Sequence, residues 1–171
     1  SSDLPFFNAC FAACAHDLDI YIVGDAGNFG NARRFAVFHP SRAGASNAFE
    51  IVTNVTGTSY YPPYLKSCTA PYLAKQNCFV IVDPKYNGKV LYKLQIPTTT
   101  VAGRKVYNAS GQWVWSQITP AGATPAVDAG DAGTYGRVSL VEDMGDGQSA
   151  LVYLGDVTAA TYVYKIPAAG L

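Results

Sequence analysis

Residues 79–96, FVIVDPKYNGKVLYKLQI, decide the fold that the sequence predicts. Two apolar runs, 79–82 and 90–96, flank a segment with a proline and an Asn-Gly pair, which is typical of a turn. β-branched and aromatic residues dominate both runs, as they do in strands. Similar strand–turn–strand units recur along the chain, so we expect a protein built from successive antiparallel hairpins.

The charge of the chain is low and balanced. Of 171 residues, 14% are charged, with 12 Lys and Arg against 12 Asp and Glu, so the net charge is zero. A basic surface for nucleic acid and a cationic helix on a membrane surface are therefore not expected. Weakly charged surfaces repel each other little. The composition thus favours a protein that is covered by partners, by sugars or by copies of itself.

Turn-rich segments divide most of the chain into short β-rich runs. The expected strands lie at 20–23, 34–39, 48–55, 79–82, 90–96, 105–108, 112–119, 137–142, 150–154 and 161–166. Because no helices separate these runs, they favour antiparallel sheets over a parallel α/β fold. The fold class is therefore all-β, an antiparallel hairpin meander with propeller-like blades or, as the alternative, a two-sheet sandwich.

Two pairs of self-similar segments fit repeated β units. Residues 24–30 (GDAGNFG) match 130–136 (GDAGTYG), and residues 90–97 (VLYKLQIP) are echoed by 162–167 (YVYKIP). Gly and Asp at such positions favour turns, and the aromatic residue can cover a neighbouring unit.

One short helix is expected near the N-terminus, within residues 4–18. There, Phe7, Cys10, Phe11 and Cys14 fall on one stripe at helical spacing. We expect this stripe to pack on a sheet, and insertion of the segment into another subunit is the alternative.

The chain is expected to form a single domain, 1–171, which is long enough to bury a core. Its parts are a helical segment at 1–19 and a hairpin array at 20–171. Within the array, a loop at 57–78 is rich in Pro and Tyr and carries cysteines.

The four cysteines, Cys10, Cys14, Cys68 and Cys78, are interpreted as disulfide-bonded. A bond between Cys10 and Cys14 would be strained in a helix, so both are expected to reach across to Cys68 and Cys78. Four cysteines allow three pairings, and a four-cysteine zinc site is the rival interpretation.

Several features favour the secretory route. Asn54-Val55-Thr56 and Asn108-Ala109-Ser110 are glycosylation sequons, and the chain has four cysteines and one Met. The opening residues SSDLP are interpreted as a processed mature N-terminus, with a cytosolic start after Met removal as the alternative. No apolar run approaches the ~18 residues of a membrane-spanning helix.

Residues 14–17, Cys-Ala-His-Asp, resemble the Cys/His-Asp helix of secreted phospholipases A2. In that family a His activates water and the neighbouring Asp helps to hold calcium, so the resemblance implies a catalytic His16 and Asp17. This chain departs from the pattern by one residue between Cys and His and lacks the glycine-rich calcium loop. A hydrolase is therefore the third-ranked function.

Two further sets of residues are candidates for ligand binding. Oxygen ligands for calcium could come from two Asp-containing loops, although turn chemistry also explains these residues; they are Asp128, Asp131, Asp143 and Asp146. Aromatic candidates for sugar or protein recognition are Tyr60, Tyr61, Tyr64, Trp113 and Trp115. The two tryptophans share one strand face, and core packing is the preferred interpretation for them.

The sequence therefore predicts a non-catalytic, secreted, all-β glycoprotein without a resident cofactor. The first expectation is a structural subunit of an extracellular or surface assembly that packs with copies of itself. The alternative is a glycan- or protein-binding module that uses the Tyr/Pro loop and the tryptophan strand.

Overall fold

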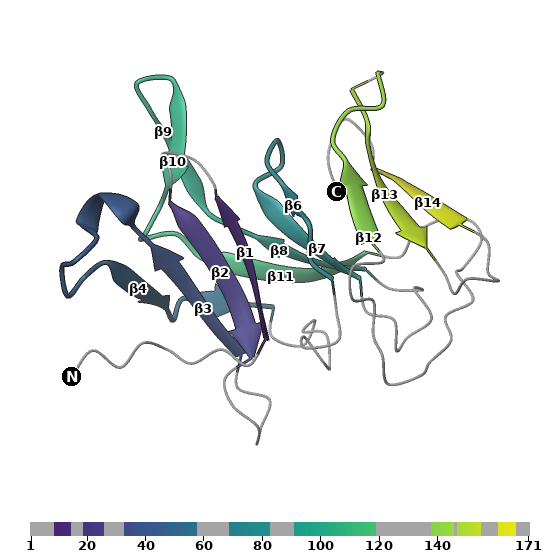
Figure 1. Cartoon of the computed structure of the whole chain (residues 1–171). Helices are drawn as coiled ribbons and strands as arrows, with labels where there is room; N and C mark the ends of the chain where they lie inside the picture. The colour runs from purple at the N-terminus through teal and green to yellow at the C-terminus, as the bar shows by residue number, and fades with distance from the viewer. Residues whose placement is uncertain are drawn as a thin grey trace.

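The computed structural model describes residues 9–14, 19–25, 33–57, 69–82, 91–118, 138–145, 147–154 and 161–166. The regular structure of these residues is β, apart from one short 3-10 turn at Pro40–Arg42 (Figure 1). The expected all-β class with antiparallel sheets is confirmed. In these ranges no helix has the length and apolar character needed to cross a membrane.

The N-terminal sheet is a four-stranded antiparallel meander in the order β1-β2-β3-β4. Its strands are β1 (Ala9–Cys14), β2 (Ile20–Asp25), β3 (Arg33–Phe38) and β4 (Phe49–Val52). The expected strands at 20–23 and 34–39 are confirmed.

The predicted N-terminal helix is wrong where the structure describes it. Residues Ala9–Cys14 form an edge strand whose six residues pair with β2 from Ala9 opposite Asp25 to Cys14 opposite Ile20. Pairing with the exposed edge of β2 satisfies the backbone of this segment, and such tertiary pairing overrides a weak local helix preference. The rest of the predicted helix lies outside the described residues.

The central sheet has five strands in the order β5-β11-β8-β7-β6. They are β5 (Val55–Thr56), β6 (Tyr72–Leu73), β7 (Cys78–Val82), β8 (Leu91–Gln95) and β11 (Trp113–Ile118). β5 runs parallel to β11, and the other pairs are antiparallel. The organising hairpin of the sequence is thus confirmed as β7 and β8.

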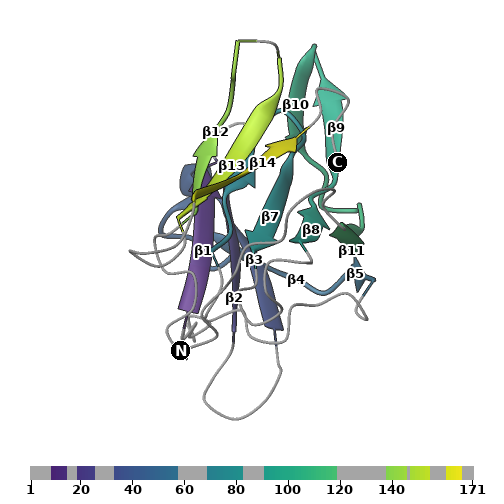
Figure 2. The same cartoon turned by 90° about the vertical axis from the view of Figure 1, so that its right-hand side faces the viewer.

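The C-terminal sheet contains β12 (Val138–Val141), β13 (Ser149–Leu154) and β14 (Thr161–Ile166), joined as consecutive antiparallel neighbours. These three strands agree with the runs expected at 137–142, 150–154 and 161–166. Figure 2 views the molecule from this end, with the C-terminal sheet towards the viewer.

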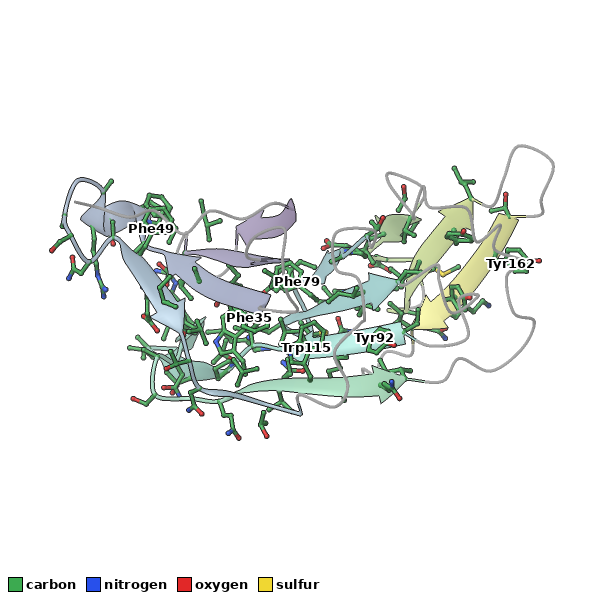
Figure 3. All side chains as sticks on the ribbon, turned by 90° about the horizontal axis from the view of Figure 1, so that it is seen from below. Phe35, Phe49, Phe79, Tyr92, Trp115 and Tyr162 are labelled. Carbon is green, nitrogen blue, oxygen red and sulfur yellow. The ribbon has the colours of Figure 1, made fainter. Side chains whose placement is uncertain are left out.

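Both faces of the central sheet are covered at β7, which explains why all five residues of this strand are buried. One core cluster joins the central sheet to the N-terminal sheet; it comprises Tyr21, Val23, Phe35, Val37, Val52, Ala70, Phe79, Ile81, Tyr92, Leu94, Ile96, Trp113 and Trp115. The other joins it to the C-terminal sheet; it comprises Leu73, Cys78, Val80, Val82, Leu91, Val138, Leu151, Tyr153, Tyr164 and Ile166. In Figure 3, Phe35, Phe79 and Trp115 lie in the first of these layers.

The region after β8 differs from the sequence expectation. The expected strands 105–108 and 112–119 follow each other in the sequence but do not form a hairpin. β10 (Arg104–Tyr107) pairs with β9 (Thr98–Val101), while β11 joins the central sheet. Ala102 and Gly103 form the tight turn between β9 and β10, and both have positive φ, as a type I′ hairpin turn requires. The β-branched run TTTV, which the sequence analysis did not assign to a strand, forms β9.

The expected strand 48–55 divides between two sheets. β4 ends at Val52 in the N-terminal sheet, and β5 begins at Val55 in the central sheet. The chain thus crosses from one layer to the next at residues 53–54. The segment 57–78, expected to be a loop, contains the short strand β6, while residues 58–68 lie outside the described part.

Gly57 secures this crossing and gives a test of the fold. Its φ is +71°, and a Cβ added there would lie 2.1 Å from the backbone oxygen of Trp115. Gly57→Ala should therefore lower the free energy of unfolding by about 2–4 kcal/mol, since it adds left-handed strain and separates β5 from β11. Urea unfolding followed by tryptophan fluorescence measures this loss.

Gly44→Ala is the matched control. Gly44 has a φ of +88° but no atom within 4 Å of an added Cβ, so only the strain of about 1–2 kcal/mol should be lost. Equal losses for the two variants would contradict a close approach at Gly57.

Candidate functional site

A cluster of titratable side chains lies at one end of the N-terminal sheet. Asp19 immediately precedes β2, His39 immediately follows β3, and Glu50 lies on β4. Ile20 pairs with Phe38, and the backbone N–H of His39 donates to the carbonyl of Ala48, so the antiparallel register brings these ends together.

The imidazole of His39 lies between two carboxylates. Nδ1 of His39 is 2.9 Å from Oδ1 of Asp19, and Nε2 is 3.3 Å from Oε2 of Glu50. His39 is 5% exposed, whereas both carboxylates keep some contact with solvent. A ring protonated on both nitrogens can donate to Asp19 and to Glu50 at once.

The cluster extends from the N-terminal sheet to the β9–β10 hairpin and the central sheet. The hydroxyl of Tyr107 donates to Oε1 of Glu50 at 2.9 Å, and Nε1 of Trp113 lies 3.4 Å from the same hydroxyl. Burial raises the pKa of Tyr107 above its ordinary range; the contact with Trp113 opposes this shift, and Glu50 adds to it. The phenol therefore remains a hydrogen-bond donor at neutral pH.

We call the cluster of Asp19, His39, Glu50 and Tyr107 the polar clamp, because its side chains contact one another across neighbouring strands. The two nitrogens of one imidazole point in divergent directions, so Asp19 and Glu50 lie on opposite sides of the ring and cannot share one metal ion with it. Within the described ranges no three His, Cys, Asp or Glu side chains are grouped to hold a metal ion. Both nitrogens of His39 already contact carboxylates, which leaves neither aimed at a substrate.

Sequence reasoning placed His39 at a strand end but did not find its partners. The available signals were Asp19 and His39 at adjacent ends of the first two expected strands, and Glu50 within an otherwise apolar run. Tyr107 could not be found in this way, because the hairpin that carries it was paired with the wrong strand.

The two tryptophans of β11 lie in the core. Trp113 and Trp115 are fully buried in the core cluster between the N-terminal and central sheets, and both rings lie near Phe35. This burial agrees with the preferred interpretation, core packing, and the glycan-binding alternative stays a prediction. The other aromatic candidates, Tyr60, Tyr61 and Tyr64, lie outside the described residues.

Cys78 is a free thiol, contrary to the disulfide prediction for this residue. It is buried in the core cluster between the central and C-terminal sheets, where the described neighbours are aliphatic and aromatic. Cys68 and the side chains of Cys10 and Cys14 lie outside the described part, so the other disulfide predictions stand as predictions.

The two sequon asparagines lie near each other. Asn54 is exposed, and its Nδ2 donates to the carbonyl of Gly111 at 3.2 Å. The backbone N–H of Gly111 in turn donates to the carbonyl of Asn108 at 2.9 Å. Two sequons that are far apart in sequence thus flank one turn.

The calcium and hydrolase candidates are mostly outside the described residues. Asp143 is exposed, and its Oδ1 accepts the backbone N–H of Gly145 at 2.8 Å, which is turn chemistry. Asp128, Asp131 and Asp146, and the pair His16 and Asp17, are not among the residues that the structure describes.

No family model, curated protein or solved structure matches the chain.

The clamp can be tested by a double-mutant cycle of Glu50→Ala and Tyr107→Phe. Each change removes the partly buried hydrogen bond between the two side chains, so the double variant should lose less stability than the sum of the single variants. We expect an interaction energy of about 1–3 kcal/mol, because the acceptor is charged. Chemical unfolding of the four proteins gives this value.

The control for the clamp is Glu142→Ala, since Glu142 is exposed. It should change the free energy of unfolding by less than about 0.5 kcal/mol. Simple additivity of Glu50→Ala and Tyr107→Phe would show that the bond contributes nothing.

The buried thiol predicts a loss of stability at alkaline pH. Burial raises the pKa of Cys78 from 9.0 to about 11, and the nearby Lys93 charge offsets part of the rise. The unfolded chain ionises first, so the contribution is complete below pH 9 and is lost as the pH rises to 11. The free energy of unfolding should fall by about 2–3 kcal/mol more across this window in the wild type than in Cys78→Ala.

Unfolding by urea at half-unit pH steps measures this difference between the two proteins. The tyrosines with raised pKa values are common to both, and they include Tyr164, whose pKa burial raises to about 12. Parallel stability curves for the two proteins would rule out a protonated, buried Cys78.

Proposed function

We propose that this protein is a non-catalytic structural subunit that assembles with copies of itself. The observation that carries the proposal is the outer face of the C-terminal sheet. The pairing register places Val141, Val152, Leu154 and Val163 on the face opposite the core. Three of these four are exposed, and Leu154 is 51% exposed.

Apolar side chains gathered on one exposed sheet face favour contact with another protein surface. On this face they have one charged neighbour, Lys165, while Ser139 and Thr161 are neutral. Together with the zero net charge of the chain, this composition opposes the approach of a second copy very little.

A structural role also agrees with the chemistry of the polar clamp. His39, the histidine in the described ranges, is 5% exposed and is held through both nitrogens by Asp19 and Glu50. Its contacts join neighbouring strands and, through Glu50 and Tyr107, two layers of the molecule. Such a group stabilises a scaffold and is poorly placed to exchange protons with a substrate.

We further propose that the protein is secreted and glycosylated, and that its sheets are stacked as in a sandwich and not radially as in a propeller. The exposed position of Asn54 and the partly exposed position of Asn108 support the sugar sites. Two core clusters on opposite faces of the central sheet support stacking.

Sedimentation velocity over a wide concentration range tests the proposal. We expect the mean mass to rise with protein concentration, before and after enzymatic removal of any N-linked sugar. Because the contact surface is mainly apolar, high salt should strengthen the association or leave it unchanged.

A sedimentation coefficient that corresponds to one chain at every concentration would refute self-assembly. Dissociation by salt would instead indicate contacts between charged groups.

A further inference from the structure

We propose that two copies of this chain meet as a symmetric dimer in which Lys75 and Lys105 of each copy contact Glu142 and Asp143 of the other. This inference rests on the proposed function, self-assembly, and names a charged contact that orients the two copies. The four charged residues are exposed and belong to three hairpins: β6–β7, β9–β10 and β12–β13.

Negative charge gathers in the turn between β12 and β13, where Glu142 and Asp143 form what we call the acidic turn. Among the side chains that the structure describes, these two are the exposed acidic ones, because the acidic residues of the polar clamp are partly buried. The hydroxyl of Ser149 donates to the backbone carbonyl of Glu142 at 2.8 Å, which fixes the start of the turn. The two carboxylates are therefore presented to solvent from a defined position.

Positive charge gathers where the β6–β7 and β9–β10 hairpins adjoin, and we call Lys75 and Lys105 there the basic end. Lys75 lies in the turn between β6 and β7, and Lys105 lies in β10; both are exposed. Nζ of Lys105 donates to the backbone carbonyl of Lys75 at 3.3 Å, which joins the two hairpins. Both lysines thus contribute charge to one region of the surface.

Each charged region also presents an apolar side chain. Val101, the last residue of β9, is 56% exposed, and Met144, which follows Asp143, is 42% exposed. A surface with one apolar side chain and positive charge is complementary to a surface with one apolar side chain and negative charge. The basic end and the acidic turn therefore suit each other in composition.

Both charged regions project to the same side of the molecule. In Figure 1 the β9–β10 hairpin rises at the left and the β12–β13 hairpin at the right, and both lie at the top again in Figure 2. A twofold axis perpendicular to the view of Figure 1, just beyond these hairpins, brings the basic end of one copy onto the acidic turn of the other. The same operation makes the reciprocal contact, so one dimer contains the charged contact twice.

A second copy fits this side of the molecule better than an unrelated charged partner. A partner with charge of one sign would be attracted by one region and repelled by the other. A second copy carries both signs at the same separation, and the zero net charge of the chain adds no overall repulsion.

The charged contact and the apolar outer face of the C-terminal sheet contribute in different ways. Exposed ion pairs add little to affinity, but complementary charges speed association and favour one orientation. Salt should therefore slow the association of the two copies, while the mass at equilibrium still depends mainly on the apolar face.

A charge exchange tests the contact. Lys105→Glu and Glu142→Lys should each slow association at least about fivefold at low salt, because each places like charges opposite each other in both halves of the dimer. The variant with both changes should recover the wild-type rate to within about twofold, since the signs are exchanged and the net charge is again zero. Stopped-flow light scattering measures these rates.

Arg42→Glu is the matched control for Lys105→Glu. Arg42 is exposed, lies between β3 and β4, and its change alters the net charge by the same amount. It should slow association less than about twofold, because it leaves the basic end and the acidic turn unchanged.

Carbodiimide cross-linking tests the position of the contact. This reagent joins an amine directly to a carboxylate, so it requires the two groups to touch. In a mixture of ¹⁵N-labelled and unlabelled wild type, we expect mixed-isotope links from Lys75 or Lys105 to Glu142 or Asp143, and fewer of them at high salt.

The outcomes separate this inference from the proposed function. A wild type that stays monomeric at every concentration refutes both. Assembly without these mixed-isotope links, and at the same rate in wild type and the two single variants, refutes the charged contact and leaves self-assembly intact. Failure of the exchanged variant to recover, or equal slowing by Arg42→Glu and Lys105→Glu, would likewise refute the charged contact.

Discussion

The structure depends on the burial of one sheet on both of its faces. β7 in the central sheet sends alternate side chains into two separate cores, with Phe79 and Ile81 on one side and Cys78 and Val80 on the other. A strand that alternates between two apolar layers has no polar face, which is why all five residues of β7 are buried. The N-terminal and C-terminal sheets then need to bury only one face each.

At one end of the N-terminal sheet, the polar side chains of the clamp lie directly beside the core. Glu50 pairs with Val37, whose side chain belongs to the core, so the carboxylate of Glu50 starts from the inner face of an edge strand. The hydrogen bond from Tyr107 and the contact with His39 compensate for its partial burial. The same contacts connect the β9–β10 hairpin to the N-terminal sheet. They therefore compensate for the burial of Glu50 and also hold two parts of the molecule together.

The C-terminal sheet, at the opposite end of the molecule, has apolar side chains on its outer face. In the C-terminal sheet, Tyr153 and Tyr164 face the core, while Val152, Leu154 and Val163 face outward. Among the described residues, the packed neighbours of this sheet lie on its inner face, and apolar side chains on an outer face are surface that a second molecule can bury. Low charge across the chain gives this surface little protection against association, and this combination supports the proposed self-assembly.

The sequence by itself determined the hairpin of β7 and β8, the strands of the C-terminal sheet and the all-β class, because alternation and turn residues act over a few neighbouring positions. Tertiary structure decided the rest. Ala9–Cys14 became a strand because the edge of β2 was available, and the run after Ala48 split because its ends pack in different layers. The contact of Tyr107 with the clamp around His39 was likewise beyond prediction, since Tyr107 meets Glu50 only after the sheets have packed. Pairing between distant segments depends on which edges and faces remain unburied, and local sequence does not contain that information.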